Sequence, residues 1–353
     1  MDNPKLRAVL IIATIIFSAG WFSCGENAGT IGVAADDEIK CQAGGDCNDA
    51  SLSNLTTIYP KFPFTSNVPR DDRYYDMTAV KAGNKVYFIG GKGTQKFNPK
   101  KQLLAYNLTK GAWTKLAPMN NARHDVGAIV MGNLIYALGG RDDVDDNKAE
   151  VYDRTTKKWT AKPDLSVDAG LDGAESRFFV GCNGNLYAVS TGRVASNLII
   201  FESSDANTWT PYDSGVGNSQ EPVLVASPDK VYIIGGNYGH NPNTFYEFNT
   251  SNHIFTLKAP HSITCRASSA TAFYFNGKIY NLYVENSNPH SLDVYDIAGN
   301  SWSQLAIPFN IGGNRYEYIF TDETAGRVYF FNPYNVTKGF SFNATTGQFS
   351  KPK

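Results

Sequence analysis

Four arginines recur at almost the same place in a tyrosine pattern that runs along the chain. Tyrosines stand at positions 87, 136, 187, 232, 280 and 329, in steps of 49, 51, 45, 48 and 49 residues. Arg73, Arg266 and Arg315 each precede such a tyrosine by 14 residues, and Arg123 precedes one by 13. A guanidinium group holds a carboxylate or a sulfate through two parallel hydrogen bonds. Arginines that converge in a partly desolvated site would therefore bind an acidic ligand.

Other polar residues follow the tyrosines in the same units. We assign three of them to the same candidate ligand-binding face, namely Arg141, Tyr238 and His240. The alternative interpretation is structural: the arginines cap the ends of strands and pair with neighbouring units. Units three and four interrupt the arginine series and carry Glu175, Arg177, Gln220 and Glu221 nearby.

Local spacing gives no metal or catalytic motif. The five histidines, at positions 124, 240, 253, 261 and 290, form no close pair of the kind that zinc sites use. We therefore expect no metal and no cofactor, and we assign no catalytic residue. The acidic run from Asp142 to Asp146 could hold calcium, but it lacks the glycine and the distal glutamate of an EF-hand loop. We expect a solvated acidic loop there.

The repeated tyrosines lie in short apolar runs that predict β-strands. Val86–Phe88 and Ile135–Ala137 are two of six such runs, and turn signals such as Gly83–Asn84 and Gly132–Asn133 precede them. Such pairs favour the positive φ angles of a tight hairpin turn. Each unit is therefore expected to contain a hairpin whose second strand carries the tyrosine.

A pair of aromatic residues marks the outer half of each unit. Its two members are seven residues apart in five units and eight apart in the third. The pairs are Tyr106/Trp113, Tyr152/Trp159, Phe201/Trp209, Phe248/Phe255, Tyr295/Trp302 and Phe342/Phe349. Turn-forming residues separate the two members, so we expect a second hairpin with one ring on each strand.

Six copies of a four-stranded unit predict a closed ring. A unit of about 50 residues cannot bury both faces of its sheet alone, whereas stacking around an axis buries both. Glycine pairs at 90–91, 139–140 and 235–236 supply backbone freedom and allow a neighbouring ring to approach closely. The predicted fold is an all-β, six-bladed β-propeller with four antiparallel strands in each blade.

The second unit resembles the Kelch repeat. It carries Arg123, Gly127, Gly139–Gly140, Val151–Asp153 and Trp159. The resemblance implies a Kelch-type propeller at 59–353, with repeats at roughly 72–117, 120–164, 173–213, 219–260, 264–308 and 314–353. Kelch propellers serve as ligase adaptors, actin binders, sugar oxidases and sialic-acid epimerases, so the fold alone does not select an activity.

The strand order of such a blade assigns every loop to one of two faces. The loops between strands two and three lie with the links between blades, on what we call the link face. The loops one–two and three–four lie on the opposite side, which we call the tip face. By resemblance, Kelch domains that bind peptides use the link face, and this is where the arginines fall.

Five Asn-x-Ser/Thr sequons predict N-glycans. They begin at Asn54, Asn107, Asn249, Asn335 and Asn343. Three of them, at 107, 249 and 343, directly follow the aromatic residue of strand three, which would place three glycans on the tip face. The alternative is that asparagine is simply favoured in hairpin tips.

The N-terminal segment has the order of a secretory signal. Lys5 and Arg7 precede the apolar run from Ala8 to Phe17, and small residues follow. We predict a signal peptide at residues 1–24, because this apolar run is too short for a stable membrane span. An uncleaved N-terminal anchor, or a lipid on Cys24, is the alternative.

The next segment, residues 25–58, is small, polar and acidic, which predicts a flexible spacer. Cys41 and Cys47 are close enough for a local disulfide bond in an oxidising compartment. Cys182 and Cys265 lie in different units, and they are either buried thiols or a bridge between non-adjacent units.

The charge balance excludes one class of partner. The 353-residue chain has a formal net charge of −1, so it has no global basic field for nucleic acid. We expect a secreted, monomeric, non-enzymatic propeller that binds an extracellular protein, an acidic peptide or a glycan through the link face. One alternative is a sialic-acid mutarotase or epimerase, with Glu175 or Glu221 as the base and Arg123 or Arg315 as the anion clamp. The other is a structural component of the extracellular matrix.

Overall fold

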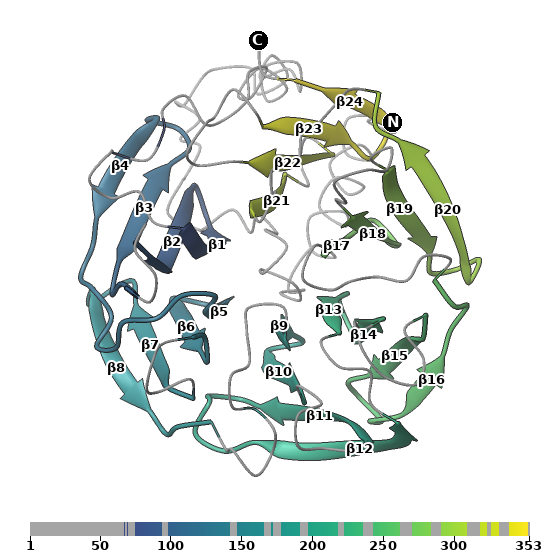
Figure 1. The fold of residues 1–353 in the computed structure, drawn as a ribbon, viewed down its shortest axis with the longest axis horizontal. Helices are drawn as coiled ribbons and strands as arrows, with labels where there is room; N and C mark the ends of the chain where they lie inside the picture. The colour runs from purple at the N-terminus through teal and green to yellow at the C-terminus, as the bar shows by residue number, and fades with distance from the viewer. Residues whose placement is uncertain are drawn as a thin grey trace, which may run out of the picture.

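The computed structural model describes residues 67, 69, 75–93, 98–141, 147–165, 171, 178–190, 197–217, 222–235, 243–261, 270–283, 291–308, 318–322, 326–331 and 339–351. Within these ranges, the strands form six antiparallel sheets of four strands each, which we number blades 1 to 6. The blades stand around a central axis (Figure 1). The expected all-β, six-bladed architecture is therefore confirmed.

Each blade takes four consecutive strands. Blade 1 holds β1 (Tyr75–Ala82), β2 (Lys85–Lys92), β3 (Leu103–Asn107) and β4 (Ala112–Lys115); blade 2 holds β5 (Gly127–Met131), β6 (Leu134–Leu138), β7 (Ala149–Asp153) and β8 (Lys158–Lys162). Blade 3 holds β9 (Phe179–Cys182), β10 (Asn185–Val189), β11 (Asn197–Ser203) and β12 (Thr210–Gly217); blade 4 holds β13 (Val223–Ala226), β14 (Lys230–Ile234), β15 (Phe245–Asn249) and β16 (Phe255–Leu257). Blade 5 holds β17 (Ala270–Phe275), β18 (Lys278–Tyr283), β19 (Ser291–Asp296) and β20 (Ser301–Ala306); blade 6 holds β21 (Tyr318–Asp322), β22 (Arg327–Phe331), β23 (Phe340–Asn343) and β24 (Gln348–Ser350).

Sequence neighbours are also sheet neighbours in every blade. The order is β1-β2-β3-β4 in blade 1 and follows the same rule through β21-β22-β23-β24 in blade 6. The first strand of each blade is innermost and the fourth is outermost (Figure 1). This up-and-down order gives the blades a link face and a tip face as defined above.

The inner strands are apolar because both faces of each sheet pack against another blade. Strands β6, β10 and β14 are buried at four consecutive positions, including the repeated tyrosines Tyr136, Tyr187 and Tyr232. A strand buried on both faces reads as a continuous apolar run rather than an alternating one. The core therefore lies in the spaces between blades.

The aromatic pairs are cross-strand partners that also join blades. Tyr152 and Trp159 face each other in register with ring centroids 5.2 Å apart. The Trp159 indole Nε1 then donates a hydrogen bond of 2.8 Å to the carbonyl oxygen of Ala117, which follows blade 1. Blade 5 repeats this contact, where Trp302 donates to the carbonyl oxygen of Ala259 at 2.9 Å.

Blade 3 departs from the aromatic pattern. Phe201 is in register with Pro211, and Trp209 lies just before the start of β12. The one additional residue in this unit shifts the register, so the expected pairing of Phe201 with Trp209 is wrong.

The glycine pairs close the second strands of blades 1 and 2. Gly90 and Gly91 have φ angles of 67° and 100°, and Gly139 and Gly140 have 55° and 101°. A Cβ atom on Gly90 would lie 2.3 Å from the carbonyl oxygen of Arg123. The expected positive φ angles are confirmed, but the approaching group is backbone and not an aromatic ring. The glycines thus bring the end of β2 against the residues that lead into β5.

Candidate functional site

Arg123 lies inside blade 2, where both terminal nitrogens of its guanidinium group have protein partners. Its Nη1 atom donates to the carbonyl oxygens of Gly139 and Lys148 at 2.6 and 2.5 Å, and Nη2 donates to Glu150 Oε1 at 2.8 Å. The Arg123 and Glu150 side chains are both 0% exposed. The group that a ligand would contact is therefore already engaged within the protein.

The Glu150 carboxylate is satisfied in the same way. It accepts hydrogen bonds from the backbone N–H groups of Asn120 and Asn121 at 2.7 and 3.3 Å. A buried ion pair is stable only when its remaining hydrogen-bonding capacity is met, and this one links the segment before β5 to β7. For Arg123 the structure thus agrees with the structural interpretation, and we remove this residue from the ligand-binding set.

The other predicted residues of the face are mostly outside the described part of the chain. Arg141 lies within the described residues. Its backbone N–H donates to the His124 carbonyl oxygen at 2.7 Å, and its carbonyl oxygen accepts from the His124 N–H at 3.0 Å. Residues outside the described ranges are Arg73, Tyr238, His240, Arg266 and Arg315, together with the alternative bases Glu175 and Glu221. Convergence of the arginines stays a prediction.

Next to the buried Arg123, the structure brings together three residues that the sequence did not connect. These are Asp76, near the start of β1, and His124 and Asp125, which precede β5. Asp76 and Asp125 occupy the same repeat position, since each precedes its repeated tyrosine by 11 residues. Both have a φ angle of 53°, a left-handed conformation that aspartate tolerates better than most residues. The Asp125 N–H donates to the Asp76 carbonyl oxygen at 2.9 Å.

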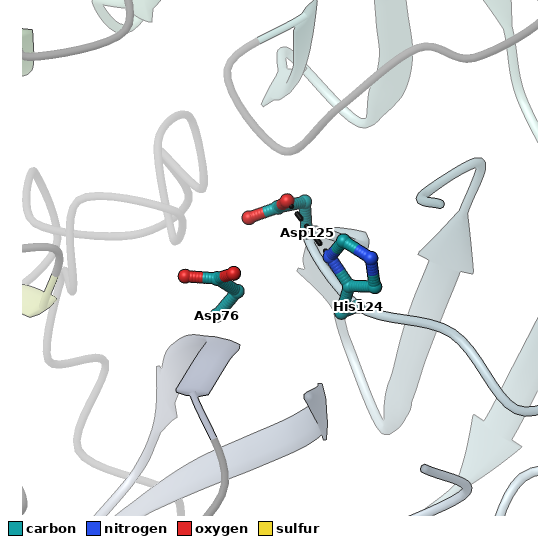
Figure 2. A group of neighbouring side chains, drawn as sticks. All are labelled: Asp76, His124 and Asp125. Atoms are coloured by element: carbon teal, nitrogen blue, oxygen red, sulfur yellow. Dashed lines mark hydrogen bonds and ion pairs between the residues drawn. The ribbon is translucent and has the colours of Figure 1, made fainter. Parts of the chain in front are cut away.

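The three side chains form one polar cluster at the inner end of blades 1 and 2 (Figure 2). One ligand atom from each lies within 4.8 Å of the others, and His124 Nδ1 is 2.9 Å from Asp125 Oδ2. The Lys92 ammonium forms an ion pair with Asp76. The side chains of Asp76, His124 and Asp125 are 17%, 10% and 30% exposed, and that of Lys92 is 36% exposed. We call Asp76, His124 and Asp125 the Asp-His-Asp cluster.

Contacts with the other described residues leave part of this cluster's acceptor capacity unused. Two carboxylates offer about eight lone-pair sites, of which these contacts engage only some. The arrangement can hold a cation, or accept hydrogen bonds from a partner that approaches the link face. A signal for it exists in the sequence: the equal 11-residue spacing, which Glu221 also shares in unit four.

A model of the Kelch motif matches residues 122–166, which include Arg123, Gly139, Gly140 and all four strands of blade 2. The chain is a Kelch-repeat β-propeller. No curated protein matches the chain. Among the residues that the structure describes, no helix is long and apolar enough to cross a membrane.

The tip face of this Kelch propeller uses its polar residues to build turns. Asn107 Oδ1 accepts hydrogen bonds from the backbone N–H groups of Thr109 and Lys110 at 3.0 and 2.8 Å. The same contacts are made at the end of strand three by Asp153, Asn249, Asp296 and Asn343. Because aspartate replaces asparagine at this position in two blades, the turn explains the residue type without a glycan. Glycosylation at 107, 249 and 343 stays a prediction, and Asn54 and Asn335 lie outside the described residues.

Two further histidines join neighbouring blades of the propeller. His253 of blade 4 stacks on Tyr212 of blade 3 at 4.1 Å, and its Nε2 is 3.2 Å from Glu202 Oε2. Burial and the Glu202 carboxylate raise the pKa of Tyr187, which therefore keeps its proton and donates to Glu202 at 2.9 Å. His261 lies 3.1 Å from Asp293 Oδ2 in blade 5. These contacts hold blades together and present little free surface.

Cys182 is the cysteine among the described residues, and it is disulfide-bonded. Cys41, Cys47 and Cys265 lie outside the described residues, so the predicted pairing of Cys41 with Cys47 stays a prediction. Cys182 is buried at the end of β9, with its sulfur 3.2 Å from the carbonyl oxygen of Ser227.

Proposed function

We propose that this Kelch propeller is a non-enzymatic binding protein that takes a protein partner on its link face. Kelch propellers typically mediate protein binding, and the fold supports such a scaffold. The proposed partner is extracellular, in line with the predicted signal peptide at residues 1–24. We propose no nucleic-acid partner and a monomeric propeller.

The observation that carries the proposal is the unequal use of polar groups on the two faces. On the tip face, the carboxylate and carboxamide oxygens at the end of strand three accept backbone hydrogen bonds from their own turns. On the described part of the link face, Asp76 and Asp125 are partly exposed, and their contacts with described residues use only some of their acceptor capacity. Polar groups that build no turn are available for recognition.

The geometry also changes which chemistry we expect at this point of the face. Arg123 is engaged by Glu150, so blades 1 and 2 together offer two partly exposed carboxylates, Asp76 and Asp125, where the sequence suggested a guanidinium group. The epimerase alternative would use Arg123 as an anion clamp, but the Arg123 guanidinium group is already paired with Glu150 and buried. We therefore favour binding over catalysis.

Site-specific photo-crosslinking on the purified secreted protein tests the face. A photoreactive amino acid is placed at Arg141 on the link face and, as the matched control, at Asp153 on the tip face. Incubation with surface proteins from the producing cells should give a discrete crosslinked species from position 141 and none from position 153. Equal crosslinking from both positions, or from position 153 alone, would overturn the proposal. Self-association of the protein in light scattering would instead favour the matrix alternative.

Secretion is tested separately. Protein recovered from the medium should begin after residue 24 and should lose mass on treatment with an N-glycan amidase. Substituting Asn107, Asn249 and Asn343 by glutamine, one at a time, should remove that mass shift in steps. Retention of the full chain inside the cell would contradict the proposed location.

A further inference from the structure

The Asp-His-Asp cluster has the composition and geometry of a metal site, and we propose that it binds a divalent cation of the zinc and manganese class. This inference goes beyond partner binding, because it concerns the protein's own residues and holds whether or not a partner docks on the link face. The three ligand atoms would be one carboxylate oxygen each from Asp76 and Asp125 and Nδ1 of His124.

The distances allow one ion to contact all three residues. Ligand atoms bind such cations at about 2.0 to 2.4 Å, so two ligands on opposite sides of an ion are up to about 4.8 Å apart. One ligand atom from each of the three residues lies within 4.8 Å of the others. The separation of 2.9 Å between His124 Nδ1 and Asp125 Oδ2 is close to the roughly 3 Å expected for adjacent ligands of one ion.

The backbone that carries the three residues is fixed from two blades. Asp125 donates its N–H to the Asp76 carbonyl oxygen at 2.9 Å, which sets the two carboxylates at one place. His124 makes two backbone hydrogen bonds to Arg141, and its ring is nine-tenths buried. Arg123, directly before it, is held by Glu150. The ligands therefore need little rearrangement to bind an ion, which would then connect blades 1 and 2.

The ligand types select the class of cation. Calcium and magnesium prefer oxygen ligands alone, whereas imidazole nitrogen together with carboxylates suits zinc and neighbouring transition metals. Three protein ligands leave coordination positions for water or for an oxygen atom of a bound partner. An acidic group of a partner could occupy such a position. The metal ion, rather than the arginines, would then bind the acidic ligand that the sequence predicts.

Substituting Lys92 should change metal affinity in the opposite direction to substituting a ligand. Its ammonium group pairs with Asp76 and so competes with a metal ion for the same carboxylate. The side chain is partly exposed and has a flexible stem, which allows it to move aside. Removing its charge should therefore strengthen metal binding, whereas removing a ligand should weaken it.

Isothermal titration of the untagged, chelator-treated full-length protein tests the site. Zinc chloride and manganese chloride should each bind at one site per chain, and calcium chloride should bind at least tenfold more weakly. Asp76→Asn, His124→Gln and Asp125→Asn should each weaken zinc binding at least tenfold. Lys92→Met should strengthen it several-fold, and Asp153→Asn, an aspartate of the tip face, should leave it unchanged.

Two outcomes would overturn the proposal. One is the absence of zinc and manganese binding by the folded protein. The other is binding that keeps its stoichiometry and affinity in the Asp76→Asn/Asp125→Asn double variant, which would assign the ion to another site. If His124→Gln does not fold, as judged by circular dichroism, the Lys92→Met and Asp76→Asn variants still carry the test. Crosslinking from position 141 is independent of these results, so failure of the metal site and failure of the partner-binding proposal are distinguishable.

Discussion

Two neighbouring groups of charged residues in blades 1 and 2 differ in burial and in how fully their hydrogen bonds are satisfied. Arg123 and Glu150 are fully buried, and each has a partner for its charge and hydrogen bonds to backbone groups. His124 and Asp125, the next residues along the chain, combine with Asp76 into a cluster that is partly exposed and only partly satisfied.

The difference shows how a repeat position can be read. A charged side chain near the start of an inner strand can turn into its own blade, as Arg123 does, or stay partly exposed, as Asp76 and Asp125 do. The two aspartates of the cluster, Asp76 and Asp125, have positive φ angles, whereas Arg123 has not.

Removing one member of the buried pair should have the largest effect on stability. Arg123→Ala leaves the Glu150 carboxylate buried without its partner, which should lower the free energy of unfolding by about 3–5 kcal/mol. Chemical denaturation monitored by circular dichroism measures this. The double variant Arg123→Met/Glu150→Met removes both charges and should recover much of the loss. A loss below about 1 kcal/mol in Arg123→Ala would show that the pair does not hold the blade.

The glycine next to the buried pair should come second. Gly90→Ala places a Cβ atom 2.3 Å from the Arg123 carbonyl oxygen at a φ angle of 67°, so we expect a loss of about 2–3 kcal/mol. Gly132→Ala is the matched control, because it has a φ angle of 54° but no atom within 4 Å of the added Cβ. It should lose only about 1 kcal/mol, the penalty for the left-handed conformation. Equal losses in the two variants would mean that the close backbone contact has no energetic weight.

The Asp-His-Asp cluster should matter little for folding. Asp125→Asn should change the free energy of unfolding by no more than about 1 kcal/mol, because partly exposed ion pairs contribute little. Thermal melts of the chelator-treated protein check this expectation. A large destabilisation by Asp125→Asn would show that the cluster stabilises the fold, as the buried pair does, and would weaken its assignment as a binding site.

The smallest effect should come from the turn-building aspartates of the tip face. Backbone N–H groups of Thr155 and Thr156 lower the pKa of Asp153, and the Gly299 N–H lowers that of Asp296. A lowered pKa contributes stability that is present above the ordinary aspartate value and is lost as pH falls through the folded value. The double variant Asp153→Asn/Asp296→Asn should therefore have a flatter stability profile below about pH 4. Denaturation midpoints at several pH values would detect this, and identical profiles would contradict it.

The sequence was sufficient for the architecture because the repeat is long, regular and apolar. Six tyrosines in register, each after a turn signal, predict the second strands, and the aromatic pairs predict the outer hairpins. The failure at Phe201 has a simple cause, since one added residue changes the strand register and the sequence does not say where a strand absorbs it.

The site was harder to predict because spacing gives a position but not a direction. The series that contains Arg123 places it correctly at the entrance to an inner strand, yet nothing in that spacing says that the guanidinium group turns toward Glu150. Asp76 and His124 are 48 residues apart, so no search for local metal-ligand pairs could join them. Comparing every residue type at equal distances from the tyrosines, rather than arginine alone, would have paired Asp76 with Asp125.

The way the ring closes has a consequence for how the protein could be rebuilt. Blades 1 and 6 each consist of four consecutive strands, and they meet through side chains such as Phe88 and Tyr318, whose ring centroids are 5.6 Å apart. In a propeller where one blade contains strands from both ends of the chain, circular permutation changes how that blade is connected. In this propeller a circular permutant opened at any other inter-blade link would keep every described sheet whole. The propeller fold should therefore not depend on which blade comes first in the sequence.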